Sequence, residues 1–307
     1  MSKANSTNSP ATKKGSLKVR KTLVAYSFIL PNLIGFFVLT FVPIVFSLIL
    51  SLCEWNSGGS IKFVGLDNFV QMFTKDKSFW ISLKNTLYFT VVTVPVTLII
   101  SLFLAILMNK PLKGRVFFRS VLFFPYVASL VAIAVVWMAL FNPLMGPVNN
   151  LLMAIGISNP PRWAASVEWA MPTIIGLTVW KGMGYYMIVY LAALQGVSRD
   201  LYEAASLDGA NSWQQFLHIT WPGVTPTTFY ILMMLLVSTF KSYDTMYITT
   251  QGGPGEATKT LAYHIYNSAF VSSKFGYASA ISMVLFVIVI CVTLIQFKFE
   301  KRFTNTV

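Results

Sequence analysis

The residue types that most often perform catalysis are sparse in this chain and lie far apart. There are two histidines, His218 and His264, and two cysteines, Cys53 and Cys291, with no CxxC or HExxH spacing. A metal site needs a denser cluster of ligands, so we expect none. The phosphate-binding patterns GxxxxGKS and GxxxxGKT are also absent. We therefore predict that the chain is not an enzyme and performs no nucleotide chemistry.

Three charged residues, Lys181, Lys241 and Asp244, interrupt long apolar runs. Charges inside a membrane are costly and usually face a cavity or a partner, so they predict a functional region. Lys241 and Asp244 are three residues apart, so they could instead neutralise each other on one helix face. Lys181 has no acid nearby in sequence. It either packs against a partner subunit or meets an anion, and an acidic sugar is one hypothesis because an ammonium readily binds a carboxylate.

Polar residues around these charges repeat at helical spacing and form two strips. Such strips are predicted to face a transport pathway, although helix packing is the alternative for each aromatic side chain. The predicted pathway residues are Lys181, Gly182, Tyr185 and Tyr186 in one run, and Leu235, Ser238, Thr239, Lys241, Ser242 and Asp244 in the other. Trp180 and Tyr190 could add ring faces for a sugar.

The elements that must position these residues are membrane spans. Of the 307 residues, 55% are hydrophobic and only 11% are charged, well below the roughly 25% of soluble domains. A helix needs about 20 apolar residues to cross the hydrocarbon layer. Six segments qualify, near 24–50, 84–108, 119–141, 170–195, 223–249 and 277–297. The predicted fold class is therefore all-α, a polytopic membrane protein with one transmembrane domain over 23–300.

Basic residues predict the orientation, because loops rich in Lys and Arg stay in the cytoplasm. The segment 1–22, the 110–119 loop and the tail 301–307 are basic and fall on one side of a six-span chain. We therefore expect both termini to be cytoplasmic and the polar segment 1–22 to be disordered. The net charge of +13 is explained in this way and calls for no nucleic acid partner.

The segment 198–222 lies on the same side but reads like part of a soluble protein. Ser198 can cap a first short helix, and Gly209 permits a left-handed turn after it. Ser212 to Gln215 has the form of a capping box and predicts a second short helix, which Pro222 limits. An amphipathic connector lying on the membrane is the alternative, but such helices are usually basic and this one begins with acids. A protein partner is favoured.

Within this segment, eight residues form a pattern that resembles the EAA motif of ATP-binding-cassette importer permeases. They are Glu203, Ala204, Ala205, Asp208, Gly209 and Ala210, followed by Phe216 and Pro222. The segments 63–69, 118–125 and 243–258 resemble others of the carbohydrate branch, the maltose-type permeases, so the resemblance covers about residues 24–300. It implies the type I importer permease fold with six transmembrane helices.

The resemblance implies a role for each part of the motif. In that family the motif is a pair of coupling helices that docks into a groove of the cytoplasmic ATPase subunit. Glu203 would then meet basic residues of the ATPase, Gly209 would make the turn between the helices, and Phe216 and its neighbours would fill the groove. The same resemblance places substrate contacts on the two polar strips.

The function that the resemblance implies is that of a permease subunit of an ATP-driven importer in a bacterial or archaeal cell membrane. It would take up a sugar or oligosaccharide delivered by an extracellular binding protein. The implied partners are a second, related permease and two ATPase subunits, which hold ATP and Mg²⁺; this subunit itself needs no cofactor. The alternative is a self-contained secondary transporter in which Asp244 carries protons and Lys181 acts as a gate.

Overall fold

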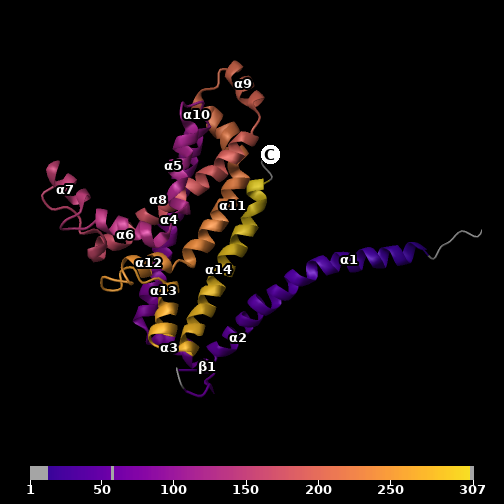
Figure 1. Ribbon diagram of the computed structural model, residues 1–307, viewed down its shortest axis with the longest axis vertical. Helices are drawn as coiled ribbons and strands as arrows, with labels where there is room; N and C mark the ends of the chain where they lie inside the picture. Colours follow the sequence, from indigo (N-terminus) through magenta and orange to yellow (C-terminus); the bar gives the residue numbers. More distant parts are fainter. Residues whose placement is uncertain (1–12, 57–58, 305–307) are drawn as a thin grey trace, which may run out of the picture.

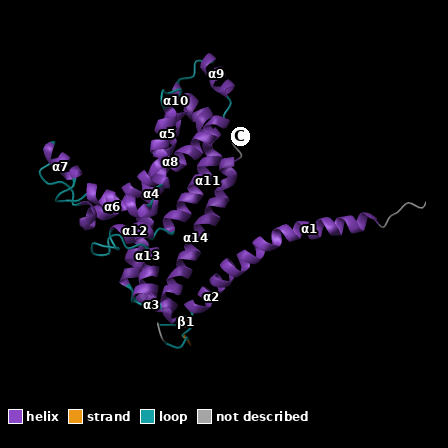
Figure 2. Cartoon of the chain, viewed as in Figure 1, coloured by secondary structure: helices purple, strands orange, loops and turns teal. Residues whose placement is uncertain are grey.

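The computed structural model describes residues 13–56 and 59–304, and most of these are helical (Figures 1 and 2). The longer helices are α1 (Lys13–Phe36), α2 (Val42–Ser51), α4 (Lys77–Asn109), α5 (Arg115–Val127), α6 (Leu130–Leu140), α8 (Val167–Gly196), α11 (Trp221–Phe240) and α14 (Phe275–Thr304). The shorter ones are α3 (Asp67–Thr74), α7 (Pro147–Ala154), α9 (Arg199–Leu207), α10 (Ser212–Gln215), α12 (Asp244–Thr249) and α13 (Leu261–Tyr266). The strands β1 (Cys53–Glu54) and β2 (Lys62–Phe63) form an antiparallel pair.

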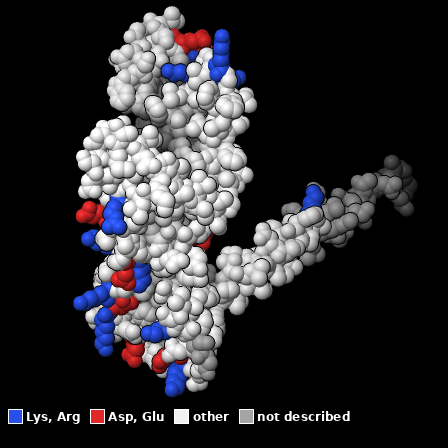
Figure 3. Space-filling view, turned by 60° about the vertical axis from the view of Figure 1, so that its left-hand side comes forward, with Lys and Arg blue, Asp and Glu red and all other residues white. Residues whose placement is uncertain are grey.

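Five helical segments are long and apolar enough to cross a membrane, and α5 with α6 makes a sixth if the bent pair is one span. The five are Val24–Ser51, Lys77–Asn109, Val167–Gly196, Ser212–Phe240 and Phe275–Lys298. On the face shown in Figure 3, charged side chains gather toward the two ends of the body and leave an uncharged band between them. The predicted all-α, multi-span fold class is confirmed.

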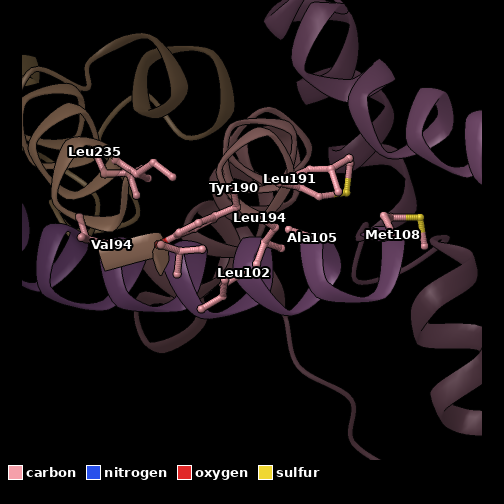
Figure 4. Close-up of a cluster of buried hydrophobic side chains, with 11 residues drawn as sticks. Val94, Leu102, Ala105, Met108, Tyr190, Leu191, Leu194 and Leu235 are labelled. Atoms are coloured by element: carbon pink, nitrogen blue, oxygen red, sulfur yellow. The ribbon is translucent and has the colours of Figure 1, made fainter. Parts of the chain in front are cut away.

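The centre of the body is the contact between α4, α8 and α11. Their largest buried cluster combines Val94, Leu102, Ala105 and Met108 of α4 with Met187, Tyr190, Leu191 and Leu194 of α8 and Val224, Ile231 and Leu235 of α11 (Figure 4). Because lipid chains are as apolar as these side chains, close packing rather than burial from water holds such helices together. Tyr190 is buried in this cluster, so the expectation that it offers a ring face to a sugar is wrong.

The first span leaves the body as a long arm. In Figure 1, the end of α2 lies beside β1, and the arm runs from there through α1 away from the other helices. A π-helical segment, Phe37–Phe41, joins the two helices. Among the described side chains between 24 and 51, only Leu50 and Ser51 are buried. The arm is therefore apolar along its length; α2 lies beside α14, whereas the described side chains of α1 remain mostly exposed.

The third span is not the single helix that was predicted over 119–141. It consists of α5 and α6, which meet at an angle of 101°. Ala128 and Ser129 between them have extended backbones, with ψ values of 150° and 129°. Irregular backbone at membrane depth is tolerated where it is buried in protein or lines a cavity. The break therefore marks a place where the chain meets something other than lipid.

The fifth span also ends earlier than predicted. Its helix stops at Phe240 instead of continuing to 249, and the chain turns before α12 begins at Asp244. The hydroxyl of Thr260 donates to the main-chain oxygen of Ser242 at 3.1 Å, which satisfies a carbonyl of the turn between α11 and α12. Lys241 and Asp244 therefore do not share a helix face, and the described residues contain no ion pair between them. The predicted strut is wrong.

Both predicted tails are partly helical. Residues 13–22 form the first turns of α1, so the expectation of disorder is wrong for them, while residues 1–12 lie outside the described part. At the other end α14 continues to Thr304, inside the predicted tail 301–307. Lys, Arg and Leu all have good helix propensity. The basic residues that flank the first and last spans therefore do not end the helices α1 and α14.

A carboxylate joins three elements at the end of the body near β1. Asp76 caps α4 by accepting from the main-chain nitrogen of Phe79 at 3.2 Å. It also accepts from the hydroxyl of Tyr277 and, at 3.0 Å, from Nε2 of His264. Burial raises the pKa of Asp76, but these hydrogen bonds outweigh it and leave the pKa below its usual value. Burial lowers the pKa of His264, against the opposite effect of Asp76.

We expect acid to destabilise this end of the protein. Because the pKa of His264 is lowered on folding, the unfolded chain takes up a proton first as pH falls through about 6.5, and stability declines. The contribution of Asp76, whose pKa is also lowered, is present above its usual value of 3.8 and is lost only at lower pH. The thermal midpoint in detergent should therefore fall by a few degrees between pH 7.5 and 5.5. His264→Gln should show a flatter dependence, and equal slopes would contradict the assignment.

Candidate functional site

A cavity of about 240 Å³ lies where α8 faces the break of the third span. Its wall comes from six helices: Thr97 of α4, Tyr126 of α5, Leu130 of α6, Leu177, Thr178, Lys181, Gly182 and Tyr186 of α8, Leu235, Ser238 and Thr239 of α11, and Thr245 of α12. Small-molecule sites are typically concave, with apolar walls and a few well-placed polar groups. The wall of this cavity likewise combines apolar side chains with a few polar groups.

The cavity contains six of the ten residues predicted for the pathway. Lys181, Gly182, Tyr186, Leu235, Ser238 and Thr239 line it together, although they come from two separate spans. Tyr185 does not line the cavity itself but stacks on Tyr126, which does, with ring centroids 4.5 Å apart. Lys241, Ser242 and Asp244 belong to the turn after α11 and do not line the cavity, because the helix that should have carried them ends at Phe240.

Sequence reasoning missed the other half of the wall. Thr97 belongs to a run of buried hydroxyls on α4, at 86, 90, 93, 97 and 101, whose helical spacing is visible in the sequence. Tyr126 carries no such signal, because it lines the cavity only through the bend that follows it. Trp180, predicted as a stacking ring, packs against Trp137 with centroids 5.4 Å apart and is not part of the wall.

Lys181 meets two neutral groups of Tyr126. Its Nζ donates to the main-chain oxygen of Tyr126 at 2.9 Å and lies 5.5 Å from the centre of the same ring. That oxygen belongs to the last turn of α5, where carbonyls have no partner within the helix. Lys181 therefore helps to satisfy the broken end of the third span, and its ammonium is held at the edge of the cavity.

A helical hairpin occupies the opposite end of the body from β1 (Figure 1). Ser198 caps α9 by accepting from the main-chain nitrogen of Asp200 at 3.2 Å. Gly209 has a φ of +81°, a left-handed conformation that glycine adopts without strain. Ala210 then donates to the main-chain oxygen of Ala205 at 2.9 Å and closes the turn. The predicted cap at Ser198 and the turn at Gly209 are both present.

Two details of the hairpin differ from prediction. The capping box is formed by Asn211 and Gln214, one residue before the predicted pair, because Asn211 has the extended backbone that a cap requires. Pro222 does not end the second helix. A π-helical segment, Phe216–Thr220, continues from α10 into α11, so that Ser212–Phe240 is one helical run. Proline is tolerated there because it stands in the first turn of α11, directly after the π-helical segment.

The hairpin exposes both acidic and apolar side chains. Glu203, Ala204 and Asp208 are exposed, and Ala205 and Ala210 are half-buried. At its tip Leu207 is 90% exposed and Trp213 is 66% exposed, with Trp213 stacked on Phe216. A hollow of about 330 Å³ opens beside Gly209. The tip therefore presents large apolar side chains next to exposed carboxylates.

These features define a class: a multi-pass membrane protein with a lined cavity between its spans and a polar hairpin at one end. Residues 85–305 match the family described as "Binding-protein-dependent transport system inner membrane component". The chain belongs to this family. It is therefore the permease component of such a transport system, as the resemblance implied.

Individual relatives agree with this membership. The chain is 38% identical over 291 residues to the lactose transport system permease protein LacF of Rhizobium radiobacter, covering 93% of this chain and 97% of that one. It is 34% identical over 283 residues to the sn-glycerol-3-phosphate transport system permease protein UgpA of Agrobacterium fabrum, covering 91% and 96%. A crystal structure of a bacterial alginate ABC transporter, in complex with alginate pentasaccharide-bound periplasmic protein, contains a chain with a TM-score of 0.83 and 25% identity, covering 94% and 97%.

Proposed function

We propose that this chain is a permease subunit of an ATP-driven importer that takes up a sugar or oligosaccharide through the cavity between its spans. The observation that carries the proposal is the continuous helical run Ser212–Phe240. Its first turns belong to the exposed hairpin, and its last turns supply Leu235, Ser238 and Thr239 to the cavity wall. A movement imposed on the hairpin would therefore reach the cavity through one helix.

The saccharide substrate is supported by the relatives and by the wall. LacF is a lactose permease by name, and the alginate transporter carries a polysaccharide. The wall itself offers hydroxyls from Thr97, Thr178, Ser238 and Thr239 in a small region. Sugars are polyols, so such a wall can replace hydrogen bonds that they make in water. Of the predicted pathway residues, we assign to this role those that line the cavity.

Coupling to ATP hydrolysis is assigned to the hairpin. Glu203, Ala204, Ala205, Asp208, Gly209, Ala210 and Phe216 would face an ATPase subunit, and Pro222 would mark the start of the span that transmits the movement. Exposed acids and a large exposed leucine suit a protein surface with basic and apolar parts. Such coupling requires two states of the permease for which the ATPase has different affinity. ATP and Mg²⁺ would be bound by that partner.

The arm Val24–Ser51 supports a second permease subunit. Its side chains are almost entirely exposed, and it diverges from the body (Figure 1). Although α2 packs beside α14, α1 runs away from the other spans, which leaves room for another protein between them. A second, related permease would fill this position. A binding protein would deliver the sugar at the β1 end.

Orientation follows from the basic residues at the hairpin end. Lys110 directly follows α4, whose last residue, Asn109, lines one pocket together with Arg199 and Glu203 of the hairpin, and Arg115 begins α5. Because basic loops remain in the cytoplasm, the hairpin and both termini would be cytoplasmic, in a bacterial or archaeal cell membrane. The secondary transporter alternative is less well supported, because Asp244 does not reach the cavity that contains Lys181.

Affinity purification in mild detergent from the cells that produce the chain should test the assembly. We expect a second permease and an ATPase to co-purify, and the preparation to hydrolyse ATP. Glu203→Lys reverses the charge of the exposed carboxylate and should lower the yield of ATPase while leaving the second permease unchanged. Sugar uptake by this chain alone in liposomes, driven by a proton gradient, would contradict the proposal.

A further inference from the structure

The cavity wall contains one charged side chain among the described residues that line it. Lys181 is that residue, and its neighbours in the wall are hydroxyl-bearing or apolar. The carboxylates of the described residues that bind a basic side chain, Glu256 with Lys259 and Asp76 with His264, lie elsewhere and leave Lys181 without a carboxylate. A charge between membrane spans is costly unless it is compensated. The ammonium is compensated here by neutral groups of Tyr126 alone.

The geometry leaves donors of Lys181 available. An ammonium has three N–H groups, and the bond to the main-chain oxygen of Tyr126 uses one of them. The position of the ammonium is fixed, because Tyr126 itself is held by its stack on Tyr185. Lys181 thus presents a positive, donor-only group at a defined point of the wall.

Four hydroxyls of the wall act as hydrogen-bond acceptors, in contrast to the ammonium of Lys181. Thr97 donates to the main-chain oxygen of Thr93 at 2.7 Å, and Thr178 donates to that of Ile174 at 2.8 Å. Ser238 and Thr239 donate in the same way to carbonyls of α11, each at 3.0 Å. A hydroxyl whose proton is used in this way offers only its oxygen to a ligand. The wall therefore accepts hydrogen bonds at these four places, and Lys181 is its one charged donor among the described lining residues.

From this division we infer that the cavity accepts a saccharide that carries a carboxylate, with Lys181 as its counter-ion. The sugar hydroxyls donate to the threonine and serine oxygens, and the carboxylate accepts from the ammonium. A single ammonium matches the single charge of a carboxylate. A phosphate monoester carries about −1.5 to −2 at neutral pH and calls for more donors than this wall provides. The inference rests on the proposed function, and it narrows the class of sugar.

Uptake by the complete transporter, reconstituted in liposomes with its binding protein and ATP, tests this inference. The probes are trisaccharides that carry a single glucuronate, galacturonate or mannuronate residue, their neutral counterparts of glucose, galactose and mannose, and sn-glycerol 3-phosphate. We expect uptake of at least one uronate trisaccharide. Lys181→Met keeps the length of the side chain without its charge and should reduce that uptake at least tenfold, while Lys181→Arg should retain most of it.

A control variant separates the loss of charge recognition from a general loss of transport activity. Lys84→Met removes an exposed lysine of α4 that does not line the cavity, and it should leave uronate uptake unchanged.

Uptake of neutral trisaccharides alone would overturn the inference and leave the proposed function intact. Uptake of glycerol phosphate alone, abolished by Lys181→Met, would replace the carboxylate by a phosphate. Failure to take up any probe would count against the proposed function itself, and equal uronate uptake by the wild type and Lys181→Met would remove Lys181 from recognition.

Discussion

Gly209→Val is expected to abolish sugar uptake while the transporter still assembles and hydrolyses ATP. Gly209 has a φ of +81°, and a β-branched residue is strained there although nothing lies within 4 Å of the added carbon. Such strain costs about 1–3 kcal/mol, so the turn between α9 and α10 should change shape. If the coupling free energy between the ATPase and the permease fell by this amount, the effect of one on the equilibrium of the other would change by roughly 5–150-fold. Uptake in liposomes and ATP hydrolysis by the same preparation measure the two effects.

Gly209→Asn provides the matched control for this prediction. Asparagine adopts the left-handed conformation more readily than other non-glycine residues, and the open space around Gly209 accommodates its side chain. It should retain most of the uptake. If valine and asparagine behaved alike, the conformation of the turn would be irrelevant to coupling. If Gly209→Val instead disappeared from the membrane, the hairpin would be required for folding and not for transmission.

Gly184→Val is expected to prevent α5 from packing against α8, and so to remove the folded protein from the membrane. A carbon added at Gly184 would overlap the main-chain oxygen of Leu122 and lie 3.0 Å from the Cα of Phe123. Because these are backbone atoms, no rotamer change can relieve the overlap, and overpacking costs typically 1–3 kcal/mol or more. The yield of monodisperse protein in gel filtration, and its thermal midpoint, should both fall sharply.

The control for Gly184 lies two turns away on the same helix. At Gly176 an added carbon would meet only a ring atom of Trp137 at 3.8 Å, which is ordinary van der Waals contact. Gly176→Ala should therefore leave the yield and the thermal midpoint close to those of the wild type. A similar loss in both variants would show that any side chain added to this face of α8 is harmful, and the specific contact with α5 would not be the cause.

Local sequence was sufficient for the first cap and the turn of the hairpin, and for most spans. Ser198 caps a helix in the sequence as it does in the structure, and a glycine at 209 predicts the left-handed turn without any knowledge of the fold. These features depend on residues within a few positions of one another. The apolar runs likewise predict spans, because a length of about 20 residues follows from the thickness of the hydrocarbon layer.

The cavity could be predicted only in part. Lys181, Tyr186 and Ser238 were found because polar residues at helical spacing stand out in apolar runs. Tyr126 was missed because its place in the wall depends on the bend after Val127, and Asp244 does not line the cavity because α11 ends at Phe240. At the first break the apolar pattern runs on, so the sequence shows no boundary there. At the second, Lys241, Ser242 and Asp244 mark the end of the helix but had been interpreted as a polar strip along it.

The sequence by itself determined the class of the protein, the number of apolar segments and the chemistry of the hairpin, since each is encoded in neighbouring residues. Tertiary structure decided where two of the spans break and which polar groups meet. The bond from Lys181 to Tyr126 joins residues 55 positions apart, and the bond from Thr260 to Ser242 joins residues 18 apart. The first satisfies a carbonyl in the last turn of α5, and the second satisfies a carbonyl in the turn that follows α11. The irregular backbone around the cavity is therefore stable only when these distant partners are in place.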